Sequence, residues 1–186
     1  MVKAVFLDRD GVINANLMRD GKPVAPTSLA EFRILPGVPE AVRRLKDAGY
    51  LVIIVTNQPD VANGVTLKAT MEAMHAEIAH RMPIDDIMIC LHTDADNCSC
   101  RKPKPGLIFA AGAKYNIDLA SSTIVGDRWR DILAGQAAGC HTILVNHGYV
   151  QDQPAVADKV VGSLAEASEY IVLRVIKPPS AARASE

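Results

Sequence analysis

Near its beginning the chain reads Val5-Phe6-Leu7-Asp8-Arg9-Asp10-Gly11, an apolar run that ends in two acidic residues one position apart. A short continuous apolar run predicts a strand buried on both faces, here residues 3–8, and such strands belong to parallel sheets. Two carboxylates this close resist carrying charge together unless a cation lies between them, so the pair favours Mg²⁺, which binds oxygen ligands. One acid can then attack a substrate while the other moves a proton. The alternative is a solvated acidic turn, because Asp-Gly is a common turn dipeptide.

Apolar runs and helix-period segments alternate through the rest of the chain, which predicts an α/β fold. We expect a Rossmann-like, mainly parallel sheet with helices on both faces, and functional groups at the carboxyl ends of its strands. The predicted strands cover residues 3–8, 50–56, 86–91, 123–126, 142–145 and 159–161. The predicted helices cover residues 36–49, 66–81, 105–115, 130–138 and 164–175. Residues 9–35 fit neither pattern and predict a loop or a small flap, a minimal cap over the site.

Length and composition predict one domain, residues 1–176, with a zinc loop at 90–102 and a flexible tail at 177–186. Of the 186 residues 49% are hydrophobic and only 4% aromatic, so a core of Val, Ile, Leu and Ala is expected. The net charge of −1 lacks the positive footprint of a nucleic-acid binder. Neither a membrane-spanning apolar run nor a signal peptide is evident. We therefore expect a cytoplasmic protein with no nucleic-acid or membrane partner. A monomer is also predicted, although no feature of the sequence fixes the oligomeric state.

The second predicted strand also ends in polar residues, Thr56-Asn57-Gln58. A hydroxyl and an amide at a strand end can donate hydrogen bonds to phosphoryl oxygens. The alternative is a helix cap or an Asx turn, which this segment taken alone favours.

The fourth predicted strand ends in Gly126-Asp127, and Asp131 follows in the first turn of the next helix. Asp127 is expected beside Asp8, where it completes a metal site, and Asp131 could orient a ligand or a basic neighbour. Acidic residues are also favoured at helix N-termini by the helix dipole, which explains one Asp more easily than three.

A basic cluster, Arg101-Lys102-Pro103-Lys104-Pro105-Gly106, opens the helix predicted at 105–115. Positive charge at a helix N-terminus attracts an anion. The alternative is a solvated basic turn, which is the interpretation preferred for Lys104.

Cysteine and histidine gather just before this basic cluster, in the pattern Cys90-x-His92-x5-Cys98-x-Cys100. Three thiolates and one imidazole at short spacing match a closed, four-coordinate structural zinc site that pins a loop. Cys140 is interpreted as a small buried hydrophobe. Four histidines without an evident partner are interpreted as helix-surface or turn residues: His75, His80, His141 and His147.

Four motifs of the chain, taken in sequence order, resemble the signatures of the haloacid-dehalogenase-like (HAD) phosphohydrolase superfamily. They are Asp8-x-Asp10-Gly11, Thr56-Asn57, Lys102 and Gly126-Asp127-x-x-x-Asp131. The signatures extend from the first predicted strand to the fourth. Three segments are similar to the histidinol-phosphatase and heptose-bisphosphate-phosphatase subfamily in particular. They are residues 7–14, the Thr56-Asn57-Gln58 element, and the Cys/His loop that runs into Arg101-Lys102-Pro103.

The resemblance implies that Asp8 is a nucleophile that forms an aspartyl-phosphate and that Asp10 is the general acid. It implies a Mg²⁺ ion held by Asp8, the backbone carbonyl of Asp10 and Asp127, with Asp131 next to these ligands but not bound to the ion. It also implies a structural Zn²⁺ in the Cys/His loop. The implied positions that fix the phosphoryl group or recognise the substrate are Thr56, Asn57, Gln58, Arg101, Lys102 and Arg128.

The chain departs from the subfamily after the second motif. Where the subfamily reads Thr-Asn-Gln-Ser-Gly and then Arg-Gly, this chain has Pro59-Asp60 and then Asn63-Gly64, so a basic residue is missing and an acid is added. Among substrates, the resemblance points most to the 7-phosphate of D-glycero-manno-heptose 1,7-bisphosphate, on the route to surface-polysaccharide heptose. The alternatives are histidinol phosphate or another small sugar phosphate. A different class stays open as well, a zinc-stabilised binding module without catalysis.

Overall fold

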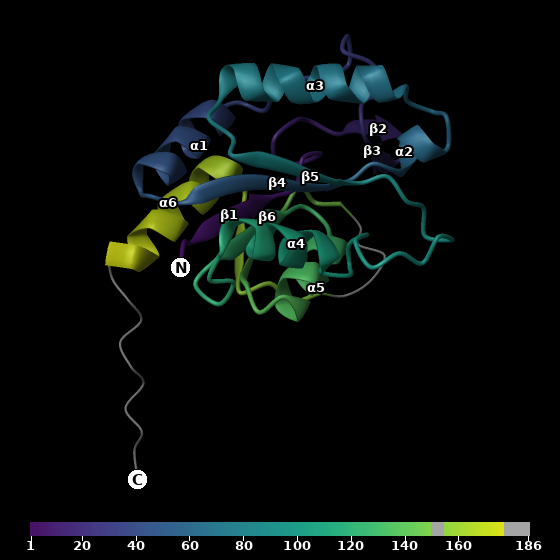
Figure 1. Cartoon of the computed structure of the whole chain (residues 1–186). Coiled ribbons are helices and arrows are strands. Elements are labelled where there is room, and N and C mark those ends of the chain that lie inside the picture. Colours follow the sequence, from purple (N-terminus) through teal and green to yellow (C-terminus); the bar gives the residue numbers. More distant parts are fainter. Residues whose placement is uncertain (150–154, 177–186) are drawn as a thin grey trace.

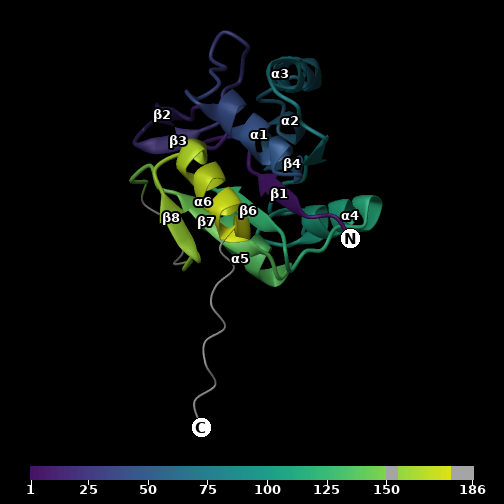
Figure 2. The same cartoon turned by 90° about the vertical axis from the view of Figure 1, so that its left-hand side faces the viewer.

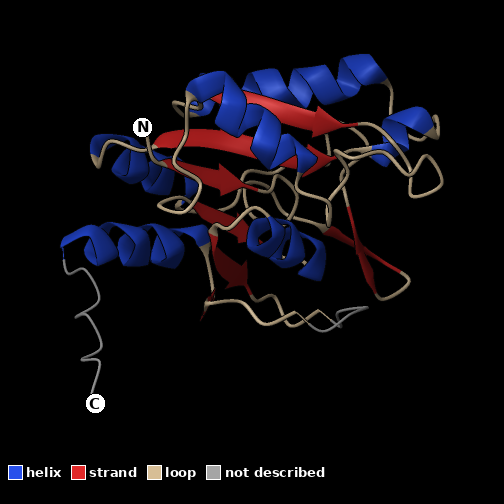
Figure 3. Cartoon of the chain, turned by 60° about the horizontal axis from the view of Figure 1, so that its bottom comes forward, coloured by secondary structure: helices blue, strands red, loops and turns tan. Residues whose placement is uncertain are grey.

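A computed structural model of the chain describes residues 1–149 and 155–176. Its main sheet contains β1 (Ala4–Leu7), β4 (Leu51–Asn57), β5 (Asp86–Cys90), β6 (Thr123–Gly126), β7 (His141–Val145) and β8 (Lys159–Val161). The strand order is β5-β4-β1-β6-β7-β8, and every neighbouring pair is parallel (Figure 3). The predicted α/β class with a mainly parallel sheet is thus confirmed.

Helices cover both faces of this sheet because successive side chains of a strand point to opposite faces. Val5 and Leu7 of β1 belong to the core shared with α1 (Val38–Asp47), α3 (Lys68–Arg81) and α6 (Leu164–Ile176). Ala4 and Phe6 belong to the core shared with α4 (Gly106–Tyr115) and α5 (Trp129–Ala137). Figures 1 and 2 show α1 and α6 side by side on one face, with α4 and α5 on the other.

The register of the strands aligns their carboxyl ends along one edge of the sheet. Leu7, the last residue of β1, is opposite Ile54 of β4 and Val125 of β6. Asn57 at the end of β4 is opposite Cys90 at the end of β5. The polar residues that follow these strands therefore share one end of the molecule, as the sequence predicted.

Two small elements were not predicted. The interval 9–35, expected to be a loop or flap, contains an antiparallel hairpin of β2 (Leu17–Arg19) and β3 (Lys22–Val24). Its strands have three residues each and Pro23 lies in one of them, so no alternating pattern marks them. The loop after β4 contains a single helical turn, α2 (Pro59–Ala62).

The predicted tail, residues 177–186, lies outside the described residues. Among the helices of the described part of the chain, none combines the length and the apolar composition that a membrane crossing requires.

Candidate active site

The acidic residues predicted at the strand ends converge. Asp8 follows β1, Asp127 follows β6, and Asp131 lies in the first turn of α5; one carboxylate oxygen from each lies within 4.8 Å of the others. Asp127 and Asp131 are each 1% exposed. Asp10 lines the same cavity as these three residues, although its carboxylate is not part of the cluster.

Gly11 lets the turn after β1 pass close to Asp127. Its φ of 87° lies in the left-handed region that favours glycine, and a Cβ built on it would lie 2.0 Å from Asp127 Oδ2. The Asp-Gly pair is therefore a turn, but it is not the solvated acidic turn of the alternative interpretation, because the Asp10 side chain is only 14% exposed and is paired with Arg9. The turn also borders the carboxylate cluster.

Lys102 supplies a buried cation to this cluster. Its Nζ lies 2.8 Å from Asp8 Oδ1 and 2.5 Å from Asp131 Oδ1, and the residue is only 2% exposed. Burial opposes the charge on Lys102, but the carboxylates of Asp131 and Asp8 outweigh it and raise the pKa of Lys102. The other oxygen of Asp131 accepts a hydrogen bond from the Arg128 backbone N–H at 3.0 Å. Asp131 therefore fixes Lys102 in place and ties it to the start of α5.

The carboxylates carry more negative charge than Lys102 neutralises. Burial and the neighbouring Asp131 raise the pKa of Asp8 to about 6. Burial and the neighbouring Asp8 and Asp131 raise the pKa of Asp127 to about 8. A set of buried carboxylate oxygens whose ionisation is this costly fits a hard divalent cation, whose charge would stabilise the ionised forms.

Asn57 joins the end of β4 to the segment that carries Lys102. Its side-chain amide donates to the Lys102 carbonyl at 3.0 Å, and its Oδ1 accepts from the Lys102 N–H at 3.1 Å. Asn57 thus holds the backbone on which the buried cation is mounted, and it lines the cavity.

Thr56 and Gln58 lie behind Asp10, and neither is among the described residues that line the cavity. Gln58 is 4% exposed and donates to Asp10 Oδ2 at 2.8 Å and to Thr56 Oγ1 at 2.9 Å. Its side chain makes no capping hydrogen bond to α2. In this structure Gln58 contacts the carboxylate of Asp10, whereas the sequence resemblance implied contact with substrate.

These groups open into a cavity of about 360 Å³ at the carboxyl end of the sheet. Arginines from three positions stand on its wall, Arg101, Arg128 and Arg130. Asp94 holds two of them, because it accepts from Arg101 Nε at 2.9 Å and from Arg130 Nη1 at 2.9 Å. The rest of the wall is formed by Asp8, Asp10, Asn16, Pro23, Val24, Ala25, Asn57, Pro59, Asp60, Lys102, Asp127 and Asp131.

Arg128 connects the hairpin to the site. Its Nη2 donates to the Pro23 carbonyl at 3.0 Å, its Nε lies 3.4 Å from Asp127 Oδ2, and its guanidinium lies 5.6 Å from the Tyr149 ring centroid. The hairpin β2–β3 therefore closes one side of the cavity through an arginine that the sequence implied for substrate recognition.

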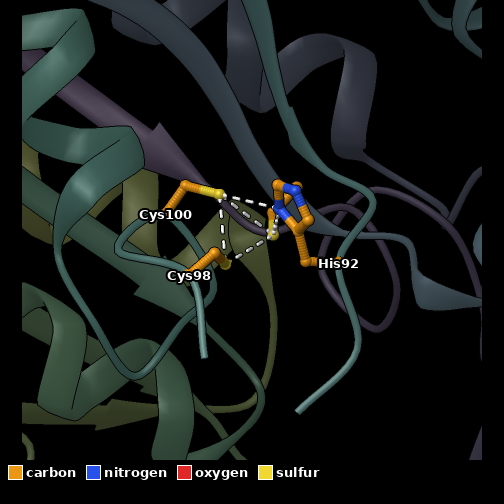
Figure 4. A group of neighbouring side chains, drawn as sticks. His92, Cys98 and Cys100 are labelled. Atoms are coloured by element: carbon orange, nitrogen blue, oxygen red, sulfur yellow. Dashed lines mark hydrogen bonds between the residues drawn. The ribbon is translucent and has the colours of Figure 1, made fainter. Parts of the chain in front are cut away.

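The Cys/His pattern folds into one cluster beside the cavity (Figure 4). Cys100 Sγ lies 3.2 Å from Cys90 Sγ, 3.4 Å from Cys98 Sγ and 3.3 Å from His92 Nδ1. Cys90 Sγ lies 3.7 Å from Cys98 Sγ and 3.6 Å from His92 Nδ1. A tetrahedral zinc with bonds of about 2.0–2.3 Å separates its ligands by about 3.5–3.8 Å, so the donor set fits this ion.

Lys104 was interpreted as a solvated basic residue, and that interpretation is incomplete. The side chain is exposed, but its Nζ donates to the Asn97 carbonyl at 3.1 Å and to the Cys98 carbonyl at 2.9 Å. Lys104 therefore holds the backbone of the Cys/His loop.

The interpretation of four histidines as helix-surface or turn residues with no evident partner is wrong for His75, which is buried, and for His141, which lies in β7. His147 is exposed in the loop after β7, as predicted, although it also has a partner. His75 is 9% exposed and its Nε2 lies 3.2 Å from Arg9 Nη1. His147 Nε2 lies 2.7 Å from the Gly11 carbonyl, so it carries a proton and donates. His141 Nδ1 lies 3.2 Å from Asp158 Oδ2. His80 is exposed, as predicted, and Cys140 is buried, as predicted.

Comparison with known proteins agrees with this geometry. A family model described as HAD-hydrolase-like matches residues 99–167. A D-glycero-beta-D-manno-heptose-1,7-bisphosphate 7-phosphatase of Vibrio cholerae is 36% identical over 94% of this chain and 98% of its own length. The enzyme of that name from Bordetella bronchiseptica is 37% identical over 79% of this chain and 82% of its own. The chain belongs to this family of HAD-like phosphatases.

A solved structure supports the same family assignment and has the same fold as this chain. A crystal structure of D,D-heptose 1,7-bisphosphate phosphatase from B. bronchiseptica, complexed with magnesium and phosphate, superposes with a TM-score of 0.80. The two sequences are 34% identical, and the match covers 93% of this chain and 99% of that one. The HAD-like superfamily and the subfamily inferred from the motifs are therefore confirmed.

Proposed function

We propose that this chain is a Mg²⁺-dependent phosphatase that removes the 7-phosphate of D-glycero-β-D-manno-heptose 1,7-bisphosphate through a phosphoryl group carried on Asp8. One observation supports the chemistry above all others: a strand-end carboxylate, Asp8, contacts a buried lysine beside two further buried carboxylates. A surface turn of acidic residues has no need of a fully desolvated counter-charge.

In this proposal Asp8 attacks the phosphorus, the P–O bond to the sugar breaks, and Asp10 gives its proton to the departing sugar oxygen. Water then attacks the phosphoryl group on Asp8, its proton passes to Asp10, and inorganic phosphate leaves. Lys102 Nζ neutralises charge on the phosphoryl oxygens from its fixed position against Asp8 and Asp131. Dividing hydrolysis in this way replaces one difficult step by two easier ones.

Asp8, the Asp10 backbone carbonyl and Asp127 are the groups proposed to hold Mg²⁺. When bound, the ion supplies positive charge against the phosphoryl oxygens and against the buried carboxylates. Asp127 is kept in place by Asn16, whose amide donates to Asp127 Oδ2 at 2.9 Å. The proposal places Zn²⁺ in the Cys/His loop as a structural ion, because all four donors of the cluster come from protein side chains.

The substrate assignment is supported by the relatives' names and by the arginines on the cavity wall. Arg101, Arg128 and Arg130 place three guanidinium groups on the cavity wall in addition to Lys102 at Asp8, and guanidinium groups suit a second anionic group of the substrate. Asp60 also lines the cavity and favours a second candidate, histidinol phosphate, because a carboxylate attracts an ammonium group and repels a phosphate.

A phosphate-release screen over heptose 1,7-bisphosphate, histidinol phosphate and hexose phosphates tests the assignment. We expect kcat/KM for the heptose bisphosphate to exceed the others by more than about tenfold, or about 1.4 kcal/mol in transition-state binding. Asp8→Asn should abolish release with zinc content unchanged, whereas the exposed Asp47→Asn should behave as wild type. A protein that binds these phosphates without releasing phosphate would instead be the binding module.

The proposals on domain organisation, location, oligomeric state and partners rest on the sequence alone. We propose that residues 1–176 act as one catalytic domain, and that the protein is a cytoplasmic monomer without a nucleic-acid partner.

A further inference from the structure

One buried ionisable side chain outside the cavity lies within reach of the catalytic machinery. His75 lies on α3, which covers the face of the sheet away from α4 and α5 (Figure 1). Its residue is 9% exposed, and its Nε2 lies 3.2 Å from Arg9 Nη1. Since an arginine side chain only donates, Nε2 accepts this hydrogen bond and the ring proton must sit on Nδ1.

Arg9 is held from three directions. Its Nη2 and Nε reach both oxygens of Asp10 at 2.9–3.2 Å, its Nη2 also donates to Gln58 Oε1 at 2.9 Å, and its Nη1 donates to His75. The guanidinium is 1% exposed, so no solvent competes for these donors. Hydrogen bonds on three sides fix the orientation of the planar Arg9 guanidinium. The guanidinium in turn fixes the orientation of the Asp10 carboxylate, to which it donates.

The carboxylate of Asp10 depends on the same set of residues. Gln58 Nε2 donates to its Oδ2 at 2.8 Å, and Asn14 Nδ2 donates to its Oδ1 at 2.9 Å. The plane of Asp10 is thus fixed by donors on the protein side, while the residue faces the cavity. Asp10 and Gln58, which also hold Arg9, lie just after strands β1 and β4, whereas His75 comes from the middle of helix α3.

Space-filling alone does not explain a histidine at this position. The other buried residues of α3 are Met71, Met74 and Ile78, so an apolar side chain would suit the core. It would also leave a buried N–H of Arg9 without an acceptor. Burial and the charge of Arg9 lower the pKa of His75 to about 4, so the ring is neutral and accepts at neutral pH.

We propose that His75 is a positioning residue for proton transfer: its neutral Nε2 locks Arg9, and Arg9 orients Asp10 toward the departing oxygen of the substrate. This inference rests on the proposed function, in which Asp10 is the general acid. His75 contacts neither the cavity nor the substrate in this account. Its loss should weaken the proton donation and leave the attack by Asp8 unaffected.

The dependence on the leaving group tests this role. An alkyl phosphate, such as heptose 1,7-bisphosphate, needs a proton on its departing oxygen, whereas the p-nitrophenolate of p-nitrophenyl phosphate leaves without one. The kcat/KM value reports the steps up to that departure. The variants are His75→Phe, which keeps a ring but loses the acceptor, His75→Gln, which restores an acceptor, and the exposed His80→Phe on the same helix as a control.

We expect His75→Phe to lower kcat/KM about tenfold on the heptose bisphosphate and less than about twofold on p-nitrophenyl phosphate, since an oriented general acid contributes on the order of 10²-fold or more. His75→Gln should recover most of the loss, and His80→Phe should match wild type. If His75→Phe does not fold, His75→Met takes its place. Equal losses on both substrates, no loss on either, or no recovery with His75→Gln would overturn the role of His75. Failure of the wild-type protein to hydrolyse either ester would instead overturn the proposed function.

Discussion

Gly11→Ala is the substitution whose effect the geometry defines most sharply. An alanine there must adopt a φ near 87°, which costs about 1–2 kcal/mol for a side chain with a Cβ. Its methyl group would lie 2.0 Å from Asp127 Oδ2, where ordinary contact begins at 3.4 Å, so Asp127 must withdraw by about 1.4 Å. Displacements of this size at a reacting site cost roughly 10²-fold in rate. We expect kcat/KM to fall about 100-fold and the Mg²⁺ concentration for half-maximal activity to rise.

Gly49→Ala separates the two causes. Gly49 has a φ of 83°, but a Cβ there meets no atom within 4 Å, so it carries the backbone cost without the clash. Gly49→Ala should lower the melting temperature by about 4 °C, which corresponds to 1–2 kcal/mol in a chain of this size, and Gly11→Ala should lower it further because the clash adds to the same backbone cost. Only Gly11→Ala should lose activity, measured by phosphate release across a Mg²⁺ titration. If the two variants were equally active, the position of Asp127 would not govern the reaction.

Four further perturbations follow from the site. Lys102→Met should lower kcat by about 10²–10³-fold and destabilise the fold by about 3–5 kcal/mol, since it leaves buried carboxylates unpaired; activity within tenfold of wild type would contradict this. Cys98→Ser should reduce zinc per chain, measured by elemental analysis, together with the melting temperature, and an unchanged zinc content would remove the loop site. In protein dialysed free of Mg²⁺ the melting temperature should fall as pH rises from 5 to 8 and then level off. The pKa of Asp127 is raised from 3.8 to about 8 in the folded protein, so between these values the folded state binds a proton that the unfolded state has lost, and the stabilisation is gone once pH passes the folded value. A pH dependence as steep in Asp127→Asn would refute this origin. Asp60→Asn should raise the preference for a bisphosphate over histidinol phosphate in a paired kcat/KM comparison, and an unchanged ratio would show that Asp60 does not affect selectivity.

The strand-end groups were predictable because two local signals suffice. Apolar runs locate the strands, and parallel topology brings their carboxyl ends to one edge, so Asp8 and Asp127 meet once β6 lies beside β1. The Cys/His cluster was predictable for a similar reason, since Cys98 and Cys100 lie close in sequence to Cys90 and need only a loop to converge.

The support behind these groups could not be read from local patterns. Arg9 lies inside the first motif, yet its partners Gln58 and His75 come from segments about 50 and 65 residues away. A signal for His75 did exist, because Met71, Met74 and Ile78 mark the buried face of α3 and position 75 lies on it. A histidine on a buried face needs a partner, and the sequence does not say which residue that is. The hairpin β2–β3 left no such signal.

Acid-quenched mass spectrometry detects the proposed phosphoryl group on Asp8 itself. Wild-type protein mixed with excess substrate and quenched within milliseconds should yield a peptide containing Asp8 that carries one phosphoryl group. Asp8→Asn should yield none, and Gly49→Ala should match wild type. A phosphoryl group found on another residue, or steady turnover by Asp8→Asn, would contradict the account.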